Sequence, residues 1–146
     1  MGSSIGKVAN GDMLQGRMIE LAGGINPANE IEVNELWPMA GLEKIFEWDP
    51  EFIFITGSEG TNYTPEDIYG DPAWSLLKAV QNGNVWVIPA KKDSWEFPGV
   101  VSVIGIDFMK HKMYPELLGE EELQNNIDEF YELAYGRTYS GEEIGY

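Results

Sequence analysis

The sequence predicts a small α/β fold in which a parallel sheet is flanked by helices. Residues 52–55 and 85–88 are short apolar runs of β-prone residues, which is typical of buried strands. Between them, Thr64-Pro65-Glu66-Asp67 has the features of a helix start, and Asn82-Gly83 those of a helix end. A strand, a helix and a strand in this order form a right-handed crossover, so we expect the two strands to be parallel.

Two helices are predicted in the first third of the chain. Asp12 can cap the first helix, and Gly23-Gly24 ends it. The inward positions of this helix are Leu14, Met18 and Leu21. Residues 25–38 are expected to be irregular. The second helix covers residues 42–49 and cannot continue through Pro50. Its apolar face consists of Leu42, Ile45 and Phe46.

Further helical segments follow. The segment before Asn82-Gly83 has an apolar face of Ala73, Leu76, Leu77 and Val80. Residues 100–113 are apolar on nearly all sides, which predicts a helix packed inside the fold. The last long helix has acids on one side and, on the other, Leu123, Ile127, Phe130, Tyr131 and Ala134. Residues 140–143 resemble a capping box, but too little chain follows for a stable helix.

The composition is that of one domain with an acidic surface. Of the 146 residues, 43% are hydrophobic and 12% are aromatic, which is enough to form a core. The net charge of −16 argues against a nucleic-acid partner, because no basic surface is available to neutralise phosphates. The absence of cysteine excludes disulfides and thiolate metal sites. No apolar window of about 18 residues predicts a membrane span.

Candidate ligand-binding residues lie in the loops after the two predicted strands, because ligands of open parallel sheets bind beyond the carboxyl ends of the strands. The candidates are Asn62 and Tyr63 in the first loop, Lys92, Asp93 and Trp95 in the second, and Trp37 ahead of the crossover. Aromatic side chains suit a bulky, partly apolar ligand, and Lys92 suits an anionic one. As alternatives, Trp37, Trp95 and Phe97 fold back onto the core, and Lys92 is a solvated turn lysine.

Signals for catalysis are weak. His111 is the only histidine, has no carboxylate at ligand spacing and is expected to be an ordinary surface residue. Ser58 lacks the nucleophile-elbow pattern. We therefore expect no catalytic residue, no metal site and no intrinsic cofactor. A small α/β enzyme that uses Asp93 and Glu96 as a carboxylate pair is the weaker alternative.

Three segments together resemble one known family. They are residues 21–26 (Leu-Ala-Gly-Gly-Ile-Asn), residues 41–56, where a short helix ends in Asp-Pro before the first strand, and residues 83–89 (Gly-Asn-Val-Trp-Val-Ile-Pro). This family comprises the iron-siderophore, haem and cobalamin substrate-binding proteins of ABC importers. The resemblance implies that residues 1–146 are a single domain. It would be the C-terminal lobe of a class III periplasmic-binding-protein fold, a Rossmann-like lobe, with the N-terminal lobe and the export signal absent from this chain.

The resemblance also implies a function and roles for particular residues. The protein would capture a ferric siderophore, haem or cobalamin outside the cytoplasm, in the periplasm or as a surface lipoprotein, and deliver it to an ABC permease. Trp37, Tyr63 and Trp95 would line the ligand cleft. Glu43 lies outside the apolar face of its helix and would dock onto the permease.

Members of this family have a further strand just upstream of the region that matches residues 5–10, and this strand has no counterpart here. We therefore expect an exposed sheet edge that residues 5–8 or a second subunit would cover. An alternative function follows from this edge. The chain would then be a free-standing partner-binding or sensor domain that forms a homodimer.

Overall fold

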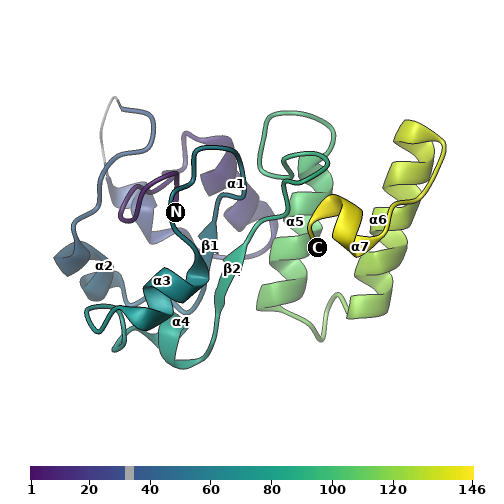
Figure 1. Cartoon of the computed structure of the whole chain (residues 1–146). Helices are drawn as coiled ribbons and strands as arrows, with labels where there is room; N and C mark the ends of the chain where they lie inside the picture. The colour runs from purple at the N-terminus through teal and green to yellow at the C-terminus, as the bar shows by residue number, and fades with distance from the viewer. Residues whose placement is uncertain (32–34) are drawn as a thin grey trace.

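The computed structural model describes residues 1–31 and 35–146 and shows an α/β fold with helices on both sides of a small parallel sheet (Figure 1). β1 (Ile53–Ile55) pairs with β2 (Val85–Val87), and Ile53 lies opposite Val85. The strands are parallel, as the predicted crossover requires. Among the described residues, these two strands make up the whole sheet.

The helices of the first third are α1 (Leu14–Leu21), the 3₁₀ helix η1 (Pro27–Glu30) and α2 (Leu42–Trp48). The predicted Asp12 cap of α1 is wrong, since Met13 is the N-cap residue and no side chain caps it. Leu21 is 68% exposed, because the buried face continues from Met18 to Ala22. In the irregular stretch 25–38, η1 forms one turn, and residues 32–34 lie outside the described residues.

The predicted burial of α2 is confirmed, with Ile45 buried and Leu42 and Phe46 half-buried. The helix ends at Asp49, which has a left-handed φ of 40° and precedes Pro50. The carboxylate of Asp49 accepts the backbone N–H of Lys78 at 3.0 Å and pairs with its Nζ at 2.9 Å. This contact links the end of α2 to the crossover that precedes β2.

The crossover consists of α3 (Pro65–Gly70), a series of turns and α4 (Lys78–Gln81). The predicted apolar face over residues 73–80 is wrong in part: Leu77 is buried and Val80 half-buried as expected, but Leu76 is 72% exposed and Trp74 is buried in its place. The turns have 3₁₀-type bonds, such as the Leu77 N–H to the Trp74 carbonyl at 3.1 Å. Residues three apart share a face in such turns, which explains the burial of Trp74 and Leu77.

The last third is helical and includes α5 (Ser102–Met113), α6 (Glu120–Tyr135) and α7 (Gly141–Ile144). α5 packs between α1 and α6, and Gly105 allows its close approach to α1 and to the loop after β2, since a Cβ there would overlap Met18 Cε and the Trp95 carbonyl. On α6, Leu123, Ile127 and Tyr131 are buried as predicted, although Ala134 is exposed. The turn α7 forms despite its shortness, because Ser140 and Glu143 complete a capping box and Ile144 is fully buried.

The buried residues form two separate core clusters. The first lies between α1, α5 and α6 and includes Phe54, Trp95 and Phe108. The second lies under α2, α3 and α4 and includes Ile45, Ile53 and Leu77. β1 contributes to both, with Phe54 in one cluster and Ile53 in the other. β1 therefore lies at the boundary between the two core clusters and packs against both.

The free edge of β1 is covered by Met1 and not by residues 5–8. The Met1 amino group donates to the Phe54 carbonyl, and the Thr56 N–H donates to the Met1 carbonyl at 3.0 Å. Residues 5–8 instead lie beside the segment before α2, where Lys7 forms an antiparallel bridge with Met39. The prediction that residues 5–8 cover this edge is therefore wrong.

The prediction that His111 is a surface residue is also wrong. Its ring is buried near the end of α5, with Nδ1 2.9 Å from the Leu118 carbonyl oxygen and Nε2 2.9 Å from Glu120 Oε2. Since a carbonyl oxygen only accepts hydrogen bonds, Nδ1 carries a proton and donates to Leu118. The ring therefore links the end of α5 to Leu118 in the connecting segment and to Glu120 at the start of α6.

Replacing His111 with alanine is expected to lower the free energy of unfolding by about 1–3 kcal/mol, because the Leu118 carbonyl loses its donor. Urea titration followed by circular dichroism measures this loss. Glu121→Ala, at an exposed neighbouring position, should change the free energy by less than about 0.5 kcal/mol. Equal stability of both variants would show that the His111 contacts do not stabilise the fold.

Candidate functional site

The loops that follow β1 and β2 meet at the carboxyl ends of the two strands. The first loop is closed by Thr61, whose hydroxyl donates to the Thr56 carbonyl at 2.9 Å. Gly57 lies against the second loop, and a Cβ at this position would overlap the Ile88 carbonyl oxygen. Only glycine therefore lets the two loops approach so closely.

Glu96 ties the two loops to α1. Its carboxylate Oε1 accepts the Ser58 N–H at 3.1 Å, and its backbone carbonyl accepts a hydrogen bond from Gln15 Nε2 at 2.8 Å. The side chain is fully buried, and Oε2 has no partner among the described residues. Burial raises the pKa of the Glu96 carboxyl above its ordinary value, while the bonds to Ser58 and Gly57 act in the opposite direction.

A second group of polar side chains surrounds Asp93. The Tyr135 hydroxyl donates to Asp93 Oδ1 at 2.8 Å, and Lys92 Nζ lies 3.9 Å from Asp93 Oδ2. The same ammonium lies 4.4 Å from the ring centroid of Tyr135 and 5.5 Å from that of Tyr139. The hydrogen bond to Asp93 raises the pKa of the Tyr135 hydroxyl. We call Lys92, Asp93, Tyr135 and Tyr139 the lysine-tyrosine cluster.

Sequence reasoning missed the two tyrosines of this cluster. Tyr135 and Asp93 are 42 residues apart, so no local pattern brings them together. The available signal was the spacing of Tyr131 and Tyr135, which places both on one side of α6, whereas Tyr139 lies beyond the end of α6 in the segment before α7.

Two predicted ligand-binding residues are buried. Trp95 is fully inaccessible, its Nε1 donates to the Tyr131 hydroxyl at 3.1 Å, and its ring packs edge-on against Phe108. Tyr63 is 7% exposed and donates its hydroxyl to the Gly2 carbonyl at 2.8 Å, and burial raises its pKa. Both rings belong to the core in this chain. For Trp95, the sequence analysis had left open this alternative, in which the ring folds back onto the core.

The other predicted residues lie apart from one another. Asn62 is exposed in the first loop, where its N–H donates to the Ser3 carbonyl at 3.3 Å. Trp37 is half-buried with a left-handed φ of 60° and lines a cavity beside β1, so it does not join the lysine-tyrosine cluster. Glu43 is exposed in the first turn of α2, as its helical position predicts.

The side chains gathered at this end of the molecule are largely polar. Asp93 and Glu96 have different partners, Tyr135 and Ser58, and the structure does not join them as a carboxylate pair. In residues 1–31 and 35–146, no three acidic or histidine side chains are grouped as metal ligands would be. None of the described helices is long and apolar enough to span a membrane.

Comparison with known proteins matches residues 2–92 to the family model described as "Periplasmic binding protein". Among curated proteins, the molybdate-binding protein MolA of Haemophilus influenzae is 23% identical over 125 residues, or 85% of this chain and 34% of its own length. The iron-uptake system-binding protein of Bacillus subtilis is 32% identical over 44% of this chain and 22% of its own length. The Fe(3+)-citrate-binding protein YfmC of the same organism is 33% identical over 49% of this chain and 22% of its own length.

Solved structures have the same fold. A periplasmic solute binding protein from Veillonella parvula aligns with a TM-score of 0.83 at 26% identity and covers 99% of this chain and 44% of that chain. Helicobacter pylori CeuE with Ni(II) bound aligns with a TM-score of 0.76 at 21% identity, covering 99% of this chain and 45% of that chain. The chain thus spans about a third of the molybdate-binding protein and less than half of these structures.

Proposed function

Because this chain belongs to the periplasmic binding protein family, we propose that it is one lobe of the solute-binding component of an ABC importer. The observation that carries this proposal is the position of polar side chains, the exposed Asn62 and Lys92 and the half-buried Asp93, in the loops after two parallel strands. This is the end of an open sheet where ligands bind. Asn62, Lys92 and Asp93 would contact the ligand, and the buried Tyr63 and Trp95 would hold their loops in place.

The proposed ligand is a ferric siderophore or a related anionic iron chelate. Two curated relatives are named for iron uptake and for binding of ferric citrate, which supports iron over haem or cobalamin. The relative named for molybdate also binds an anion. Lys92 supplies a positive charge at the proposed site in a chain whose net charge is −16. An extracytoplasmic parent protein fits the same relatives.

The ligand proposal is tested by titrating this chain with ferric citrate and following its backbone amides by NMR. One lobe buries only one side of the ligand, so a dissociation constant of about 1 mM is expected. Paramagnetic broadening should be confined to residues 57–63 and 89–97, and diamagnetic gallium citrate should shift the same signals. Lys92→Ala should weaken binding about two- to fivefold, whereas Lys110→Ala on α5 should not.

Molybdate and Ni(II) serve as the competing probes in the same titration. Broadening spread over the whole chain, or shifts at the two loops with molybdate alone, would overturn the iron-chelate proposal. Binding of any of these probes elsewhere on the chain would contradict the proposed site.

Glu43→Arg is expected to abolish transport without changing ligand affinity, because Glu43 is an exposed residue of α2 and belongs to neither of the loops that would contact the ligand. Uptake of labelled ferric ligand by cells that carry the two-lobed parent measures transport. Glu66→Arg is the matched control, since Glu66 is also an exposed first-turn glutamate, on α3. Unchanged uptake with Glu43→Arg would remove the docking role.

A further inference from the structure

A buried carboxyl lies at the junction of the two loops that would contact the ligand. The Glu96 side chain is fully inaccessible to solvent, and its oxygen Oε2 has no hydrogen-bond partner among the described residues. Buried acids normally gain a cation or several donors in return for the lost hydration. Glu96 forms an ion pair with none of the described cations. An ionised carboxylate is costly in such a position, so its charge state should affect the structure around it.

Glu96 connects the first loop to the second. Its oxygen Oε1 accepts the Ser58 N–H at 3.1 Å, and its backbone carbonyl accepts a hydrogen bond from Gln15 Nε2 at 2.8 Å, which fixes Glu96 against α1. In the described part of the chain, no residue other than Glu96 forms a hydrogen bond between residues 57–63 and residues 89–99. The first loop therefore depends on a single side chain for its hydrogen-bonded attachment to the second.

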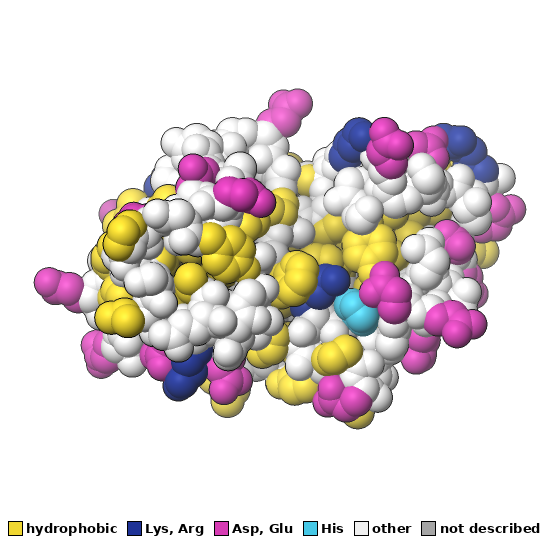
Figure 2. All heavy atoms as spheres, turned by 60° about the horizontal axis from the view of Figure 1, so that its bottom comes forward, with side chains coloured by type: hydrophobic (Ala, Val, Ile, Leu, Met, Phe, Trp, Pro, Cys, Tyr) yellow, Lys and Arg dark blue, Asp and Glu magenta, His cyan; other side chains and the backbone are white. Residues whose placement is uncertain are grey.

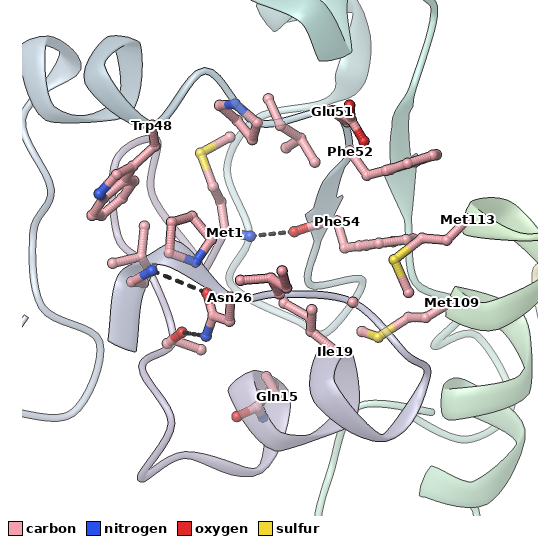
Figure 3. Close-up of a pocket in the computed structure, with 18 of the residues that line it drawn as sticks. Met1, Gln15, Ile19, Asn26, Trp48, Glu51, Phe52, Phe54, Met109 and Met113 are labelled. Atoms are coloured by element: carbon pink, nitrogen blue, oxygen red, sulfur yellow. Dashed lines mark hydrogen bonds between the residues drawn. The ribbon is translucent and has the colours of Figure 1, made fainter. Parts of the chain in front are cut away.

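The bases of both loops border unfilled space. Gln15 on α1 lies at the wall of the cavity beside β1, which has a volume of about 650 Å³ (Figure 3). Thr56 and Ile88, which lie at the ends of the two strands where the loops begin, line the same cavity. Groups next to such space lack neighbours on one side, unlike those in a close-packed interior. A small displacement of the first loop would therefore meet little steric resistance.

We propose that Glu96 is a positioning residue of the ligand site, which holds the first loop in its binding arrangement when uncharged and releases it when ionised. The inference rests on the proposed function, because the first loop carries Asn62, one of the proposed ligand contacts. An uncharged carboxyl can stay dry and still accept the Ser58 N–H. An ionised one needs water or a donor at Oε2, which the packed loops do not supply. Hydration of Oε2 then separates the two loops.

The direction of the pH dependence follows from the surroundings of Glu96. Burial outweighs the hydrogen bonds from Ser58 and Gly57, so the pKa of the carboxyl is raised above its ordinary value of 4.5. The packed arrangement is therefore favoured below that value and is lost as the pH rises through the raised pKa. Glu59 in the first loop is exposed. Charged side chains on the other surrounding elements have partners elsewhere: Arg17 with Glu20 on α1, Lys92 with Asp93 in the second loop, and Asp107 on α5 with Asn126.

The response of the loop is tested first without ligand. The carboxyl carbon of Glu96, followed by NMR, should titrate with a midpoint above 4.5. Over the same pH range, the backbone order parameters of residues 58–62 should fall from about 0.85 to below about 0.6. Glu96→Gln resembles the uncharged side chain and keeps an acceptor for the Ser58 N–H, so its order parameters should stay high from pH 5 to pH 8. Glu59→Gln, at an exposed position of the same loop, should leave the pH dependence unchanged.

The effect on the ligand is measured by titrating gallium citrate at the same pH values. The dissociation constant of the unmodified chain is divided by that of Glu96→Gln, because this ratio cancels the pH dependence of the ligand itself. The ratio should rise from about 1 at pH 5 to about 10 at pH 8, since a released loop must be ordered again on binding.

Order parameters of residues 58–62 that stay constant while Glu96 titrates would overturn the proposal. The same loss of order in Glu96→Gln, or a midpoint at or below 4.5, would also overturn it. A loop that responds while the ratio stays at about 1 would support the control of the loop by Glu96. It would contradict the proposed contact between Asn62 and the ligand, so failure of the proposed function is distinguishable from failure of this inference.

Discussion

Lowering the pH from 8 to 5 is expected to destabilise the fold by about 3 kcal/mol, because burial lowers the pKa of the Met1 amino group from 8.0 to about 5. The amino group lies on the edge of β1, where it donates to the Phe54 carbonyl. A charge at this position would lose its hydration without gaining a counter-ion. The folded chain therefore resists protonation that the unfolded chain accepts.

The direction of the effect follows from proton binding in the two states. Above pH 8 the amine is neutral in both states, and the full contribution to stability is present. Between pH 8 and about 5 only the unfolded chain binds the proton, so stability falls as the pH falls. Glu96 acts in the opposite direction, since its raised pKa makes the folded chain lose stability as the pH rises through that pKa.

Urea titrations at several pH values between 5 and 8 measure this dependence. Acetylation of the Met1 amine removes the titrating group and should abolish the slope. Glu96→Gln in the same background isolates the opposing contribution of the buried carboxyl. A slope that persists unchanged after acetylation would show that the Met1 amine is not the group responsible.

Trp95→Ala is expected to lower the free energy of unfolding by about 3–5 kcal/mol, the range for truncation of a fully buried aromatic side chain. The ring contacts Phe108 and Tyr146, and its Nε1–H donates to the Tyr131 hydroxyl. Truncation leaves a void in the first core cluster and an unpaired hydroxyl on Tyr131. The loop after β2 should then lose the packing that positions Lys92 and Asp93.

Chemical denaturation followed by circular dichroism measures this effect. Phe97→Ala is the matched control, because Phe97 is in the same loop but 52% exposed, and its loss should be less than about 1 kcal/mol. Equal losses for the two variants would contradict the assignment of Trp95 to the core. They would favour the direct role in ligand contact that the sequence predicts.

The parts of the fold that could be predicted from sequence are those with strong local signals. The apolar runs at residues 52–55 and 85–88 contain both strands, and the crossover rule makes them parallel. The face of α6 follows from the spacing of Leu123, Ile127 and Tyr131. In each case the residues that make the pattern are close together in the chain.

The errors arise where small changes in local geometry or distant contacts decide the outcome. The 3₁₀-type turns before α4 bury Trp74 in place of the predicted Leu76, while Leu77 is buried as predicted. His111 is buried because its ring contacts the Leu118 carbonyl and the Glu120 carboxylate. The lysines on either side of His111 in the sequence give no sign of these contacts. At the site, the bond between Tyr135 and Asp93 joins segments that share no sequence pattern.

The distribution of charge has a consequence for the behaviour of the molecule in solution. Figure 2 shows acidic side chains mostly around the outline of the face and hydrophobic ones toward its middle. Two such molecules repel each other over a distance set by the ionic strength, about 10 Å at 0.1 M salt and about 3 Å at 1 M. Concentrated salt therefore removes this repulsion, and self-association through the hydrophobic middle of this face should increase. At low ionic strength the repulsion should keep the molecules apart.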